Sequence, residues 1–378
     1  MLSETESLLF LEEPYQWEEL VRAFGWVRDL KGCPQDPVFH AEGDVFIHTR
    51  MVVETLMDLP AWQALPREAR QVVFAACLLH DIGKPATTVT EDDGRITSRG
   101  HSRKGERMAR QIMALGDVRR PFGLREQVCG LVRYHSLPIW LLDKDDPLRA
   151  ATAASLKVNT EWLALVAEAD MRGRTGPDLE DQLLRIDLFR EFCREHACYG
   201  KPYAFPSDQS RFVYFHKPDG YPTYEAFDDT QFEVFLMMGL PGAGKDTWIM
   251  ENCPDLPVVS LDAVREQMGI DPKDNQGPVL QRTKEYAREL MRRKQSFVWN
   301  ATNVSRSRRA ELIDLFTVYK GRVTLVFLDT PIETVIAQNR GRTRVVPETV
   351  IYRFLEKLEA PDLTEAQQVI VVESRKDK

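Results

Sequence analysis

The chain has 378 residues, of which 43% are hydrophobic and 29% are charged, the balance of a globular protein rather than of a disordered or fibrous one. This length predicts two ordinary domains, and the net charge of -8 argues against a wholly basic nucleic-acid coat. The six cysteines form no Cys-x-x-Cys pair, so the sequence indicates neither a zinc ribbon nor a disulfide scaffold and predicts reduced core residues.

The first residues are acidic: Glu4 and Glu6 stand where a signal peptide would carry positive charge. The apolar runs 72–79 and 234–238 are far shorter than the roughly 20 residues that cross a bilayer. We therefore expect a cytoplasmic protein with no membrane partner.

Residues 17–196 have the apolar spacing of helices nearly throughout, which predicts an all-α domain over residues 1–200. The clearest predicted helices are Arg67–His80, His101–Leu115, Arg125–Tyr134, Thr160–Met171 and Asp178–Glu195.

Histidines and aspartates recur along this helical region in an ordered series: His48, His80, Asp81, His101, His135 and Asp170. Imidazole nitrogens and carboxylates brought together from different helices suit a divalent transition metal. The remaining histidines, His40, His196 and His216, lie outside this series and are predicted to be surface or core residues.

The run His80-Asp81-Ile-Gly-Lys84-Pro resembles the signature of the HD phosphohydrolase superfamily, and the resemblance spans about 39–174. It implies that His48, His80, Asp81 and Asp170 hold one metal. His101 and His135 match the extra histidines of members that hold two, with Mn, Ni, Co, Fe and Zn all open. Such a metal would activate water for attack on phosphorus. A group of nearby cations would orient the substrate oxygens: Lys84, Arg99, Arg103, Lys104, Arg172 and Arg174.

A Pro-rich stretch breaks the helical pattern and predicts a connecting segment over residues 201–230. Within it, residues 211–216 are compatible with a short hairpin.

From residue 231 to residue 378, short β-rich runs alternate with helices, which predicts an α/β domain with a parallel sheet. The predicted strands are Glu233–Met238, Pro257–Ser260, Ser296–Asn300, Arg322–Leu328 and Gln368–Val372.

The first of these strands runs into a glycine-rich sequence with the G-x-x-x-x-G-K spacing of a P-loop, made of Gly239, Leu240, Pro241, Gly242, Ala243, Gly244, Lys245, Asp246 and Thr247. Its backbone N–H groups and the following helix N-terminus would hold the phosphates of ATP or another NTP. Lys245 would place a cation on the β- and γ-phosphates.

The residue after Lys245 departs from the usual pattern, because Asp246 stands where a Ser or Thr normally holds Mg²⁺ and the hydroxyl follows at Thr247. A carboxylate is itself a hard oxygen ligand, so either residue could serve Mg²⁺ or Mn²⁺.

The second predicted strand ends just before Asp262, at the edge where open α/β sheets bind ligands. Asp262 could act as general base for an attacking hydroxyl while Arg265, one turn on, grips a phosphate of the acceptor. An N-cap aspartate with a surface arginine is the alternative interpretation.

The P-loop, the Asp262-x-x-Arg265 pair and a late arginine segment before Val-Pro347 together resemble the bacteriophage-type 5′-OH polynucleotide kinases. The resemblance implies a lid at 339–347, in which Arg342 and Arg344 close over the phosphates. The turn 300–303 is similar to an Asn/Thr turn of these kinases. A further set of basic residues could follow a nucleic-acid backbone or be exposed helix charges: Arg292, Arg293, Lys294, Arg306, Arg308 and Arg309.

The order of the two modules resembles the bacterial bifunctional HD–polynucleotide kinase family. The resemblance implies phosphorylation of 5′-OH ends, removal of a 2′,3′-cyclic phosphate or 2′-phosphate from RNA ends, action on RNA and possibly DNA, and cooperation with a separate RNA ligase. Two alternatives stay open: an HD nucleotidase fused to a nucleoside or small-molecule kinase, and a nucleotide-sensing regulator.

Overall fold

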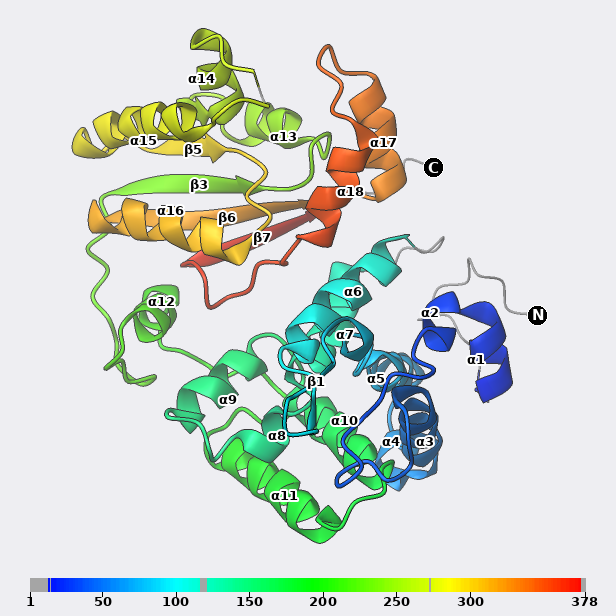
Figure 1. Cartoon of the computed structure of the whole chain (residues 1–378). Helices are drawn as coiled ribbons and strands as arrows, with labels where there is room; N and C mark the ends of the chain where they lie inside the picture. The colour runs from blue at the N-terminus through cyan, green and yellow to red at the C-terminus, as the bar shows by residue number, and fades with distance from the viewer. Residues whose placement is uncertain (1–12, 14, 116–120, 272, 375–378) are drawn as a thin grey trace. The chain divides into compact units, whose positions relative to one another are not determined.

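The computed structural model describes residues 13, 15–115, 121–271 and 273–374, and the chain divides into two compact units, 1–204 and 205–378 (Figure 1). The acidic first residues lie outside the described part. No helix among the described residues is long and apolar enough to span a membrane.

The first unit is helical, as predicted. Its helices are α1 Trp17–Ala23, α2 Gly25–Arg28, α3 Val45–Asp58, α4 Pro60–Gln63, α5 Arg67–Leu79, α6 His101–Leu115, α7 Phe122–Tyr134, α8 Leu137–Trp140, α9 Pro147–Ser155, α10 Thr160–Arg172 and α11 Leu179–Glu195. A short antiparallel ladder, β1 Val89–Thr90 with β2 Ile96–Thr97, lies between α5 and α6 in sequence.

Helix α5 is the centre of this unit. Its residues 72–79 are at most 1% exposed, and a helix that is apolar all round belongs in a core. Helices α3, α7 and α10 pack against it. Residues at and near the ends of these helices are thereby brought close together.

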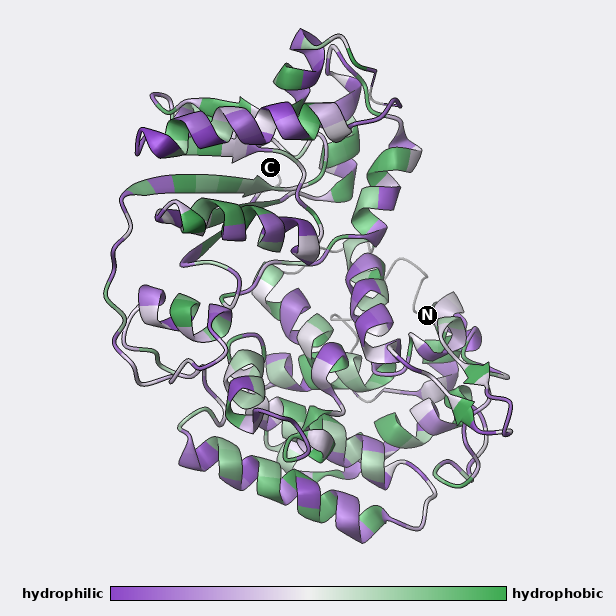
Figure 2. Cartoon of the chain, turned by 60° about the vertical axis from the view of Figure 1, so that its left-hand side comes forward, coloured by the Kyte–Doolittle hydropathy of each residue, from purple (hydrophilic) through white to green (hydrophobic). Residues whose placement is uncertain are grey.

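The second unit is built on a five-stranded parallel sheet in the order β4-β5-β3-β6-β7. Its elements are α12 Asp208–His216, β3 Phe232–Met238, α13 Lys245–Asn252, β4 Val258–Ser260, α14 Leu261–Gln267, α15 Gly277–Arg292, β5 Phe297–Asn300, α16 Arg306–Val318, β6 Gly321–Asp329, α17 Ile332–Arg340, α18 Glu348–Glu356 and β7 Gln368–Glu373. The strands are largely hydrophobic, whereas α15 is amphipathic (Figure 2). The predicted fold class of both domains is confirmed.

Strand β3 lies in the middle of the sheet, between β5 and β6. The chain leaves it on one side through α13 to the edge strand β4, while the later strands β6 and β7 lie on its other side. Such a reversal of direction creates the crevice at the carboxyl edge where α/β sheets bind ligands. The P-loop follows β3 directly and so occupies that crevice.

The predicted hairpin at 211–216 is wrong, because these residues belong to helix α12. Ser207 caps the helix by accepting a hydrogen bond from the backbone N–H of Ser210 at 3.0 Å. Arg211 then donates to the carbonyls of Leu363 and Gln367, at 2.8 and 2.6 Å. These tertiary contacts place much of the predicted connecting segment in the second unit.

Candidate active sites

In the first unit, helix ends bring the predicted metal ligands together. His80 and His135 are the residues that end α5 and α7, and His101 is the first residue of α6. His48 lies inside α3, and Asp170 lies in the last turn of α10. Side chains as far apart in sequence as His48 and Asp170, 122 positions, thus come together at one centre.

One group of three ligands is almost fully enclosed. The Nε2 atom of His48 lies 3.2 Å from Nε2 of His80 and 3.0 Å from Oδ1 of Asp170. The three residues are 0%, 1% and 6% exposed. We call this group the buried trio.

A second group of three ligands lies beside the first. The Nε2 atoms of His101 and His135 are 3.2 Å apart, and His101 Nε2 lies 3.5 Å from Oδ1 of Asp81. The other oxygen of Asp81, Oδ2, lies 3.2 Å from Nε2 of His80. Asp81 therefore faces both groups, and we call Asp81, His101 and His135 the second trio.

The histidine rings are held with Nε2 turned inward. The Nδ1 atoms of His80, His101 and His135 lie 2.7–2.9 Å from backbone carbonyls three residues earlier. A carbonyl only accepts, so each Nδ1 carries its proton. Burial, together with the charges of His101 and His80, lowers the pKa of His135 to about 4, so its Nε2 is a bare lone pair at neutral pH.

The carboxylates complete a set that fits a divalent cation. Burial alone would raise the pKa of Asp81, but Lys84 and His80 outweigh it and hold the pKa well below its usual range. Its Oδ1 atom is buried without a hydrogen-bond partner, an arrangement that costs free energy unless something binds there. Nitrogen and oxygen donors converging in this way are typical ligands of transition metals.

Among the nearby cations, Lys84 alone is shown in contact with the predicted ligands: its Nζ lies 2.7 Å from Asp81 Oδ2. Arg172 and Arg174 are paired with Glu168 and Asp178. Arg99, Arg103 and Lys104 are exposed.

A residue that the sequence analysis missed, Glu42, also belongs to this centre. Its Oε1 lies 3.0 Å from Nδ1 of His48 and 2.9 Å from Nδ1 of His40, which had been assigned to surface or core. Glu42 precedes α3 in a loop and has no periodic relation to His48, so nothing in the spacing singled it out.

In the second unit, the P-loop has the conformation that its glycines predict. Gly239, Gly242 and Gly244 have φ values of +148°, +85° and +90°, which L-residues rarely adopt. A Cβ on Gly242 would also lie 2.8 Å from the carbonyl oxygen of Val335. The loop is therefore closed tightly onto α17.

Lys245 folds back into this loop. Its Nζ donates to the carbonyls of Gly239 and Leu240 at 3.0 and 2.9 Å. Burial lowers the pKa of Lys245 to about 8, and the positive charge of Arg342 acts in the same direction. The charge of Arg342 thus acts on Lys245, while the role of Arg342 in a lid stays a prediction.

Asp246 is tied to the end of the neighbouring strand. Its Oδ1 accepts a hydrogen bond from Nδ2 of Asn300 at 2.7 Å, while its side chain stays exposed. Thr247 is exposed as well. The carboxylate is thus held at the carboxyl edge of the sheet, within the phosphate-binding region.

Asp262 and Arg265 form an ion pair on α14. The Asp262 side chain is 76% exposed and that of Arg265 is 19% exposed. Arg265 also donates from Nε to Oε1 of Gln276 at 2.7 Å. Arg265 therefore holds Asp262 directly, a contact that the sequence did not predict.

The predicted lid is anchored at its base and open at its tip. The buried Asn339 donates to the carbonyl of Val346 and accepts from its N–H, at 2.8 and 3.0 Å. Arg344 pairs with Glu266 of α14 at 2.9 Å. The two favoured arginines thus differ. Arg342 lowers the pKa of Lys245 by its charge, and Arg344 contacts α14, the helix that carries Asp262.

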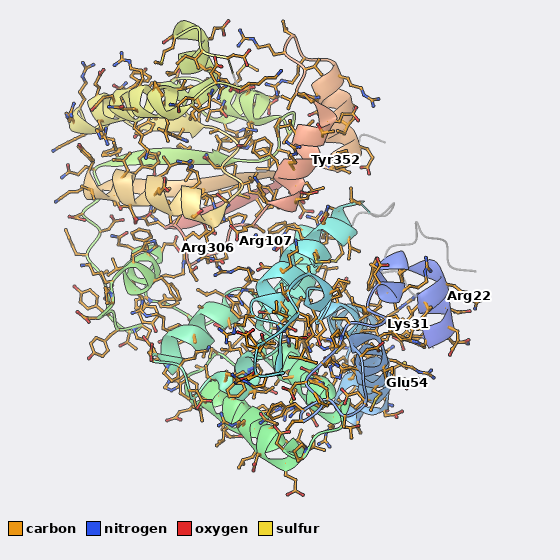
Figure 3. The ribbon with its side chains drawn as sticks, viewed as in Figure 1. Arg22, Lys31, Glu54, Arg107, Arg306 and Tyr352 are labelled. Atoms are coloured by element: carbon orange, nitrogen blue, oxygen red, sulfur yellow. The ribbon has the colours of Figure 1, made fainter. Side chains whose placement is uncertain are left out.

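For Arg309, both alternatives are wrong, because the residue is neither an exposed helix charge nor open to a nucleic-acid backbone. Its side chain is fully buried and donates to both oxygens of Glu365, at 2.7 and 2.9 Å. Arg306, labelled in Figure 3, pairs with Asp362 at 2.6 Å. The basic residues 292–294 lie between the end of α15 and the start of β5. They are therefore at the amino ends of the parallel strands, whereas the P-loop is at the carboxyl ends.

Comparisons with known proteins agree with this division. Residues 45–171 match the model of the HD domain, and residues 234–361 match a model described as an AAA domain. HD domains bind divalent metals, and P-loop kinases use a nucleotide with Mg²⁺. The chain is therefore an HD phosphohydrolase-type domain followed by a P-loop kinase-like domain.

Among curated proteins, the chain is similar to proteins named Multifunctional CCA protein. That of Thioalkalivibrio sulfidiphilus is 30% identical over 181 residues, which is 46% of this chain and 41% of the relative. That of Ralstonia nicotianae is 31% identical over 184 residues, or 45% of this chain and 38% of the relative. The chain thus spans about two fifths of the length of these relatives.

Among solved structures, the chain is similar to a putative kinase from Chloroflexus aurantiacus, with 14% identity, a TM-score of 0.32, and coverage of 38% of this chain and 89% of that one. It is also similar to a gluconokinase from Sinorhizobium meliloti, with 21% identity, a TM-score of 0.28, and coverage of 38% and 83%. These likenesses concern the fold only.

Proposed function

We propose that the chain is a bifunctional nucleic-acid end-healing enzyme. Its second unit phosphorylates 5′-OH ends with ATP or another NTP and Mg²⁺ or Mn²⁺. Its first unit removes a 2′,3′-cyclic phosphate or a 2′-phosphate from RNA ends. Together the two steps prepare broken RNA, and possibly DNA, for a separate ligase.

The kinase half of the proposal rests on the arrangement of residues around the P-loop. Lys245 sits inside the loop, and Asp246 is fixed by Asn300 beside it. Asp262 follows β4 at the same edge of the sheet, which supports its proposed role of taking the proton of an attacking hydroxyl. Arg342 and Arg344 then offset the charge that develops on the transferred phosphoryl group.

The exposure of Asp262 is the observation that favours a polymer as acceptor. Its carboxylate is 76% exposed, whereas an enzyme for a small hydroxyl compound usually encloses its substrate. An open acceptor side can admit a strand end whose remaining nucleotides extend away from the protein.

The hydrolase half rests on the two ligand trios. A divalent cation there would lower the pKa of a coordinated water and offset charge on phosphoryl oxygens. Asp81 belongs to the second trio, and its other oxygen lies beside His80 of the buried trio. The backbone carbonyls orient the histidine rings, and Lys84 lies beside Asp81 to orient an anionic substrate oxygen.

The test uses an oligoribonucleotide with a 5′-OH and a 2′,3′-cyclic phosphate, incubated with the full chain, ATP and Mg²⁺ or Mn²⁺. Both ends are then identified by mass spectrometry. We expect a 5′-phosphate and loss of the cyclic phosphate. A matched DNA oligomer and free nucleosides are offered in parallel.

Controls assign each product to its site. Lys245→Ala should lose only the 5′-phosphate, and Asp81→Ala should lose only the 3′-end product. Phosphorylation of nucleosides but not of the oligomers would contradict the proposal and favour the small-molecule kinase. Absence of turnover on every substrate would favour a nucleotide sensor.

A further inference from the structure

The four inward-facing histidines are not held in the same way. His80, His101 and His135 lie at helix ends, where the carbonyl three residues earlier is available to their Nδ1 atoms. His48 lies inside α3, where the backbone carbonyls are engaged in the helix. Its Nδ1 atom therefore needs a partner from outside the helix.

Glu42 is that partner. Its carboxylate oxygen Oε1 lies 3.0 Å from Nδ1 of His48. A carboxylate only accepts, so its position favours the neutral ring with the proton on Nδ1 and the lone pair on Nε2. The side chain is only 2% exposed and is fixed by two further donors, His40 Nδ1 at 2.9 Å and the backbone N–H of Thr175 at 2.8 Å. Each of these contacts opposes reorientation of the carboxylate.

Glu42 also links α3 and α10, the two helices that carry His48 and Asp170 of the buried trio. Thr175 follows α10, and its carbonyl accepts from the N–H of Ala41 at 2.9 Å. At Gly173 the helices come so close that a Cβ would lie 2.6 Å from Cα of Val52 in α3. The loop that carries Glu42 is thus joined to the end of the helix that carries Asp170.

We propose that Glu42 is a positioning residue that orients His48 toward a divalent cation and makes the buried trio the tighter of two cation sites. The inference rests on the proposed metal centre. A carboxylate behind an imidazole fixes its tautomer and strengthens its Nε2 as a donor, more than a neutral carbonyl does.

The surroundings of the two trios agree with this difference in affinity. The side chains of the buried trio are at most 9% exposed, whereas that of His101 in the second trio is 23% exposed. A ligand side chain that is exposed to water binds a cation less tightly than one that is held in a closed site. The second trio should therefore exchange its cation more readily.

The experiment measures cation binding rather than turnover. The full chain is freed of metal with a chelator and titrated with Mn²⁺, and free Mn²⁺ is followed by electron paramagnetic resonance. We expect two classes of site in the unchanged protein. In Glu42→Gln the tight class should weaken by about 10–100-fold, as outer-shell changes commonly do, while the weak class is unchanged.

Two variants serve as controls. Glu54→Gln changes an exposed carboxylate of α3, the helix that carries His48, which is paired with Arg50, and this variant should bind Mn²⁺ like the unchanged protein. His40→Gln removes a neighbour of Glu42 without removing the carboxylate, and should largely retain the tight class. If Glu42→Gln does not fold by circular dichroism, Glu42→Asp is used, whose shorter arm should still weaken the tight class.

The outcomes separate the two proposals. If the unchanged protein binds no Mn²⁺, the proposed metal centre itself is wrong. If it binds two classes and the folded Glu42 variant binds both unchanged, only the role of Glu42 is wrong. Equal weakening of both classes would indicate a general structural role and would also overturn the inference.

Discussion

The two sites of this chain differ most in their exposure to solvent. In the first unit, His48 and Asp81 have side chains that are 0% and 2% exposed. In the second unit, Asp262 and Arg344 have side chains that are 76% and 68% exposed. One site is enclosed by helices, and the other lies at the open edge of a sheet.

The difference follows from what each site holds. A metal site gains from fixed ligands in a dry surrounding, because ligands that are already oriented need no rearrangement when the cation binds. A phosphoryl-transfer site has to admit a nucleotide and an acceptor, and it closes only when its lid moves. Substitutions in the first unit should therefore act mainly through lost cation binding. Substitutions in the second unit should act on turnover or on the binding of Mg²⁺ and nucleotide.

The largest effect is expected from the ligands that the metal centre cannot replace. Asp81→Ala removes the carboxylate that faces both trios, so we expect phosphohydrolysis to fall by more than about a hundredfold, beyond the effect of an outer-shell change. Kinase turnover should remain within about twofold, and circular dichroism checks the fold. Loss of kinase activity in a folded Asp81→Ala protein would mean that the sites are coupled.

The kinase site should show the opposite pattern. Asp262→Ala should lower turnover on a 5′-OH oligomer by about 10²–10⁴-fold, the usual contribution of a general base. ATP affinity should change little, since the proposed role of this side chain is toward the acceptor hydroxyl. Titration with a fluorescent nucleotide measures the affinity, and near-normal turnover at saturating substrate would remove Asp262 from its assigned role.

The buried ion pair of Arg309 tests stability rather than activity. Arg309→Ala leaves the Glu365 carboxylate unpaired in the core, and breaking such a pair costs about 3–5 kcal/mol. Arg308→Ala, one residue earlier and exposed, should change the free energy of unfolding by less than about 0.5 kcal/mol. Urea unfolding followed by fluorescence compares them, and equal midpoints would contradict the assignment.

The carboxylate after the P-loop lysine should matter more for Mg²⁺ than the hydroxyl that follows it. Asp246→Ala should raise the Mg²⁺ concentration for half-maximal turnover several-fold, because Asn300 holds this carboxylate at the phosphate-binding edge. Thr247→Ala should have a smaller effect. The reverse ranking in a Mg²⁺ titration would transfer the role to Thr247.

The smallest effect is a pH dependence of nucleotide affinity. Because the pKa of Lys245 is lowered to about 8, the free protein loses this charge above that pH and must take up a proton when ATP binds. Affinity should then fall by up to about tenfold per pH unit above pH 8. Arginine stays charged, so in Lys245→Arg the affinity measured by calorimetry should depend less on pH. If the affinities of both proteins fall in parallel with pH, the titration of Lys245 is not the cause.

Local patterns in the sequence determined the fold class, the strands and the P-loop. The run 72–79 is apolar on every side and could only be a core segment, and the glycines before Lys245 have the spacing that a phosphate loop requires. The order of His48, His80, Asp81 and Asp170 likewise indicated a metal centre. Each of these signals lies within one element or one short motif.

Tertiary packing alone decided the partners between distant segments. Glu42 contacts His48 because α3 and α10 approach closely at Gly173. Arg309 can be buried because the carboxylate of Glu365, distant in sequence, pairs with it. Ser207 and the carbonyls near residue 365 likewise turned an aromatic stretch into α12. A charge or a hydrogen bond between such segments leaves no periodic trace along the chain, since its free energy depends on a distance that only folding sets.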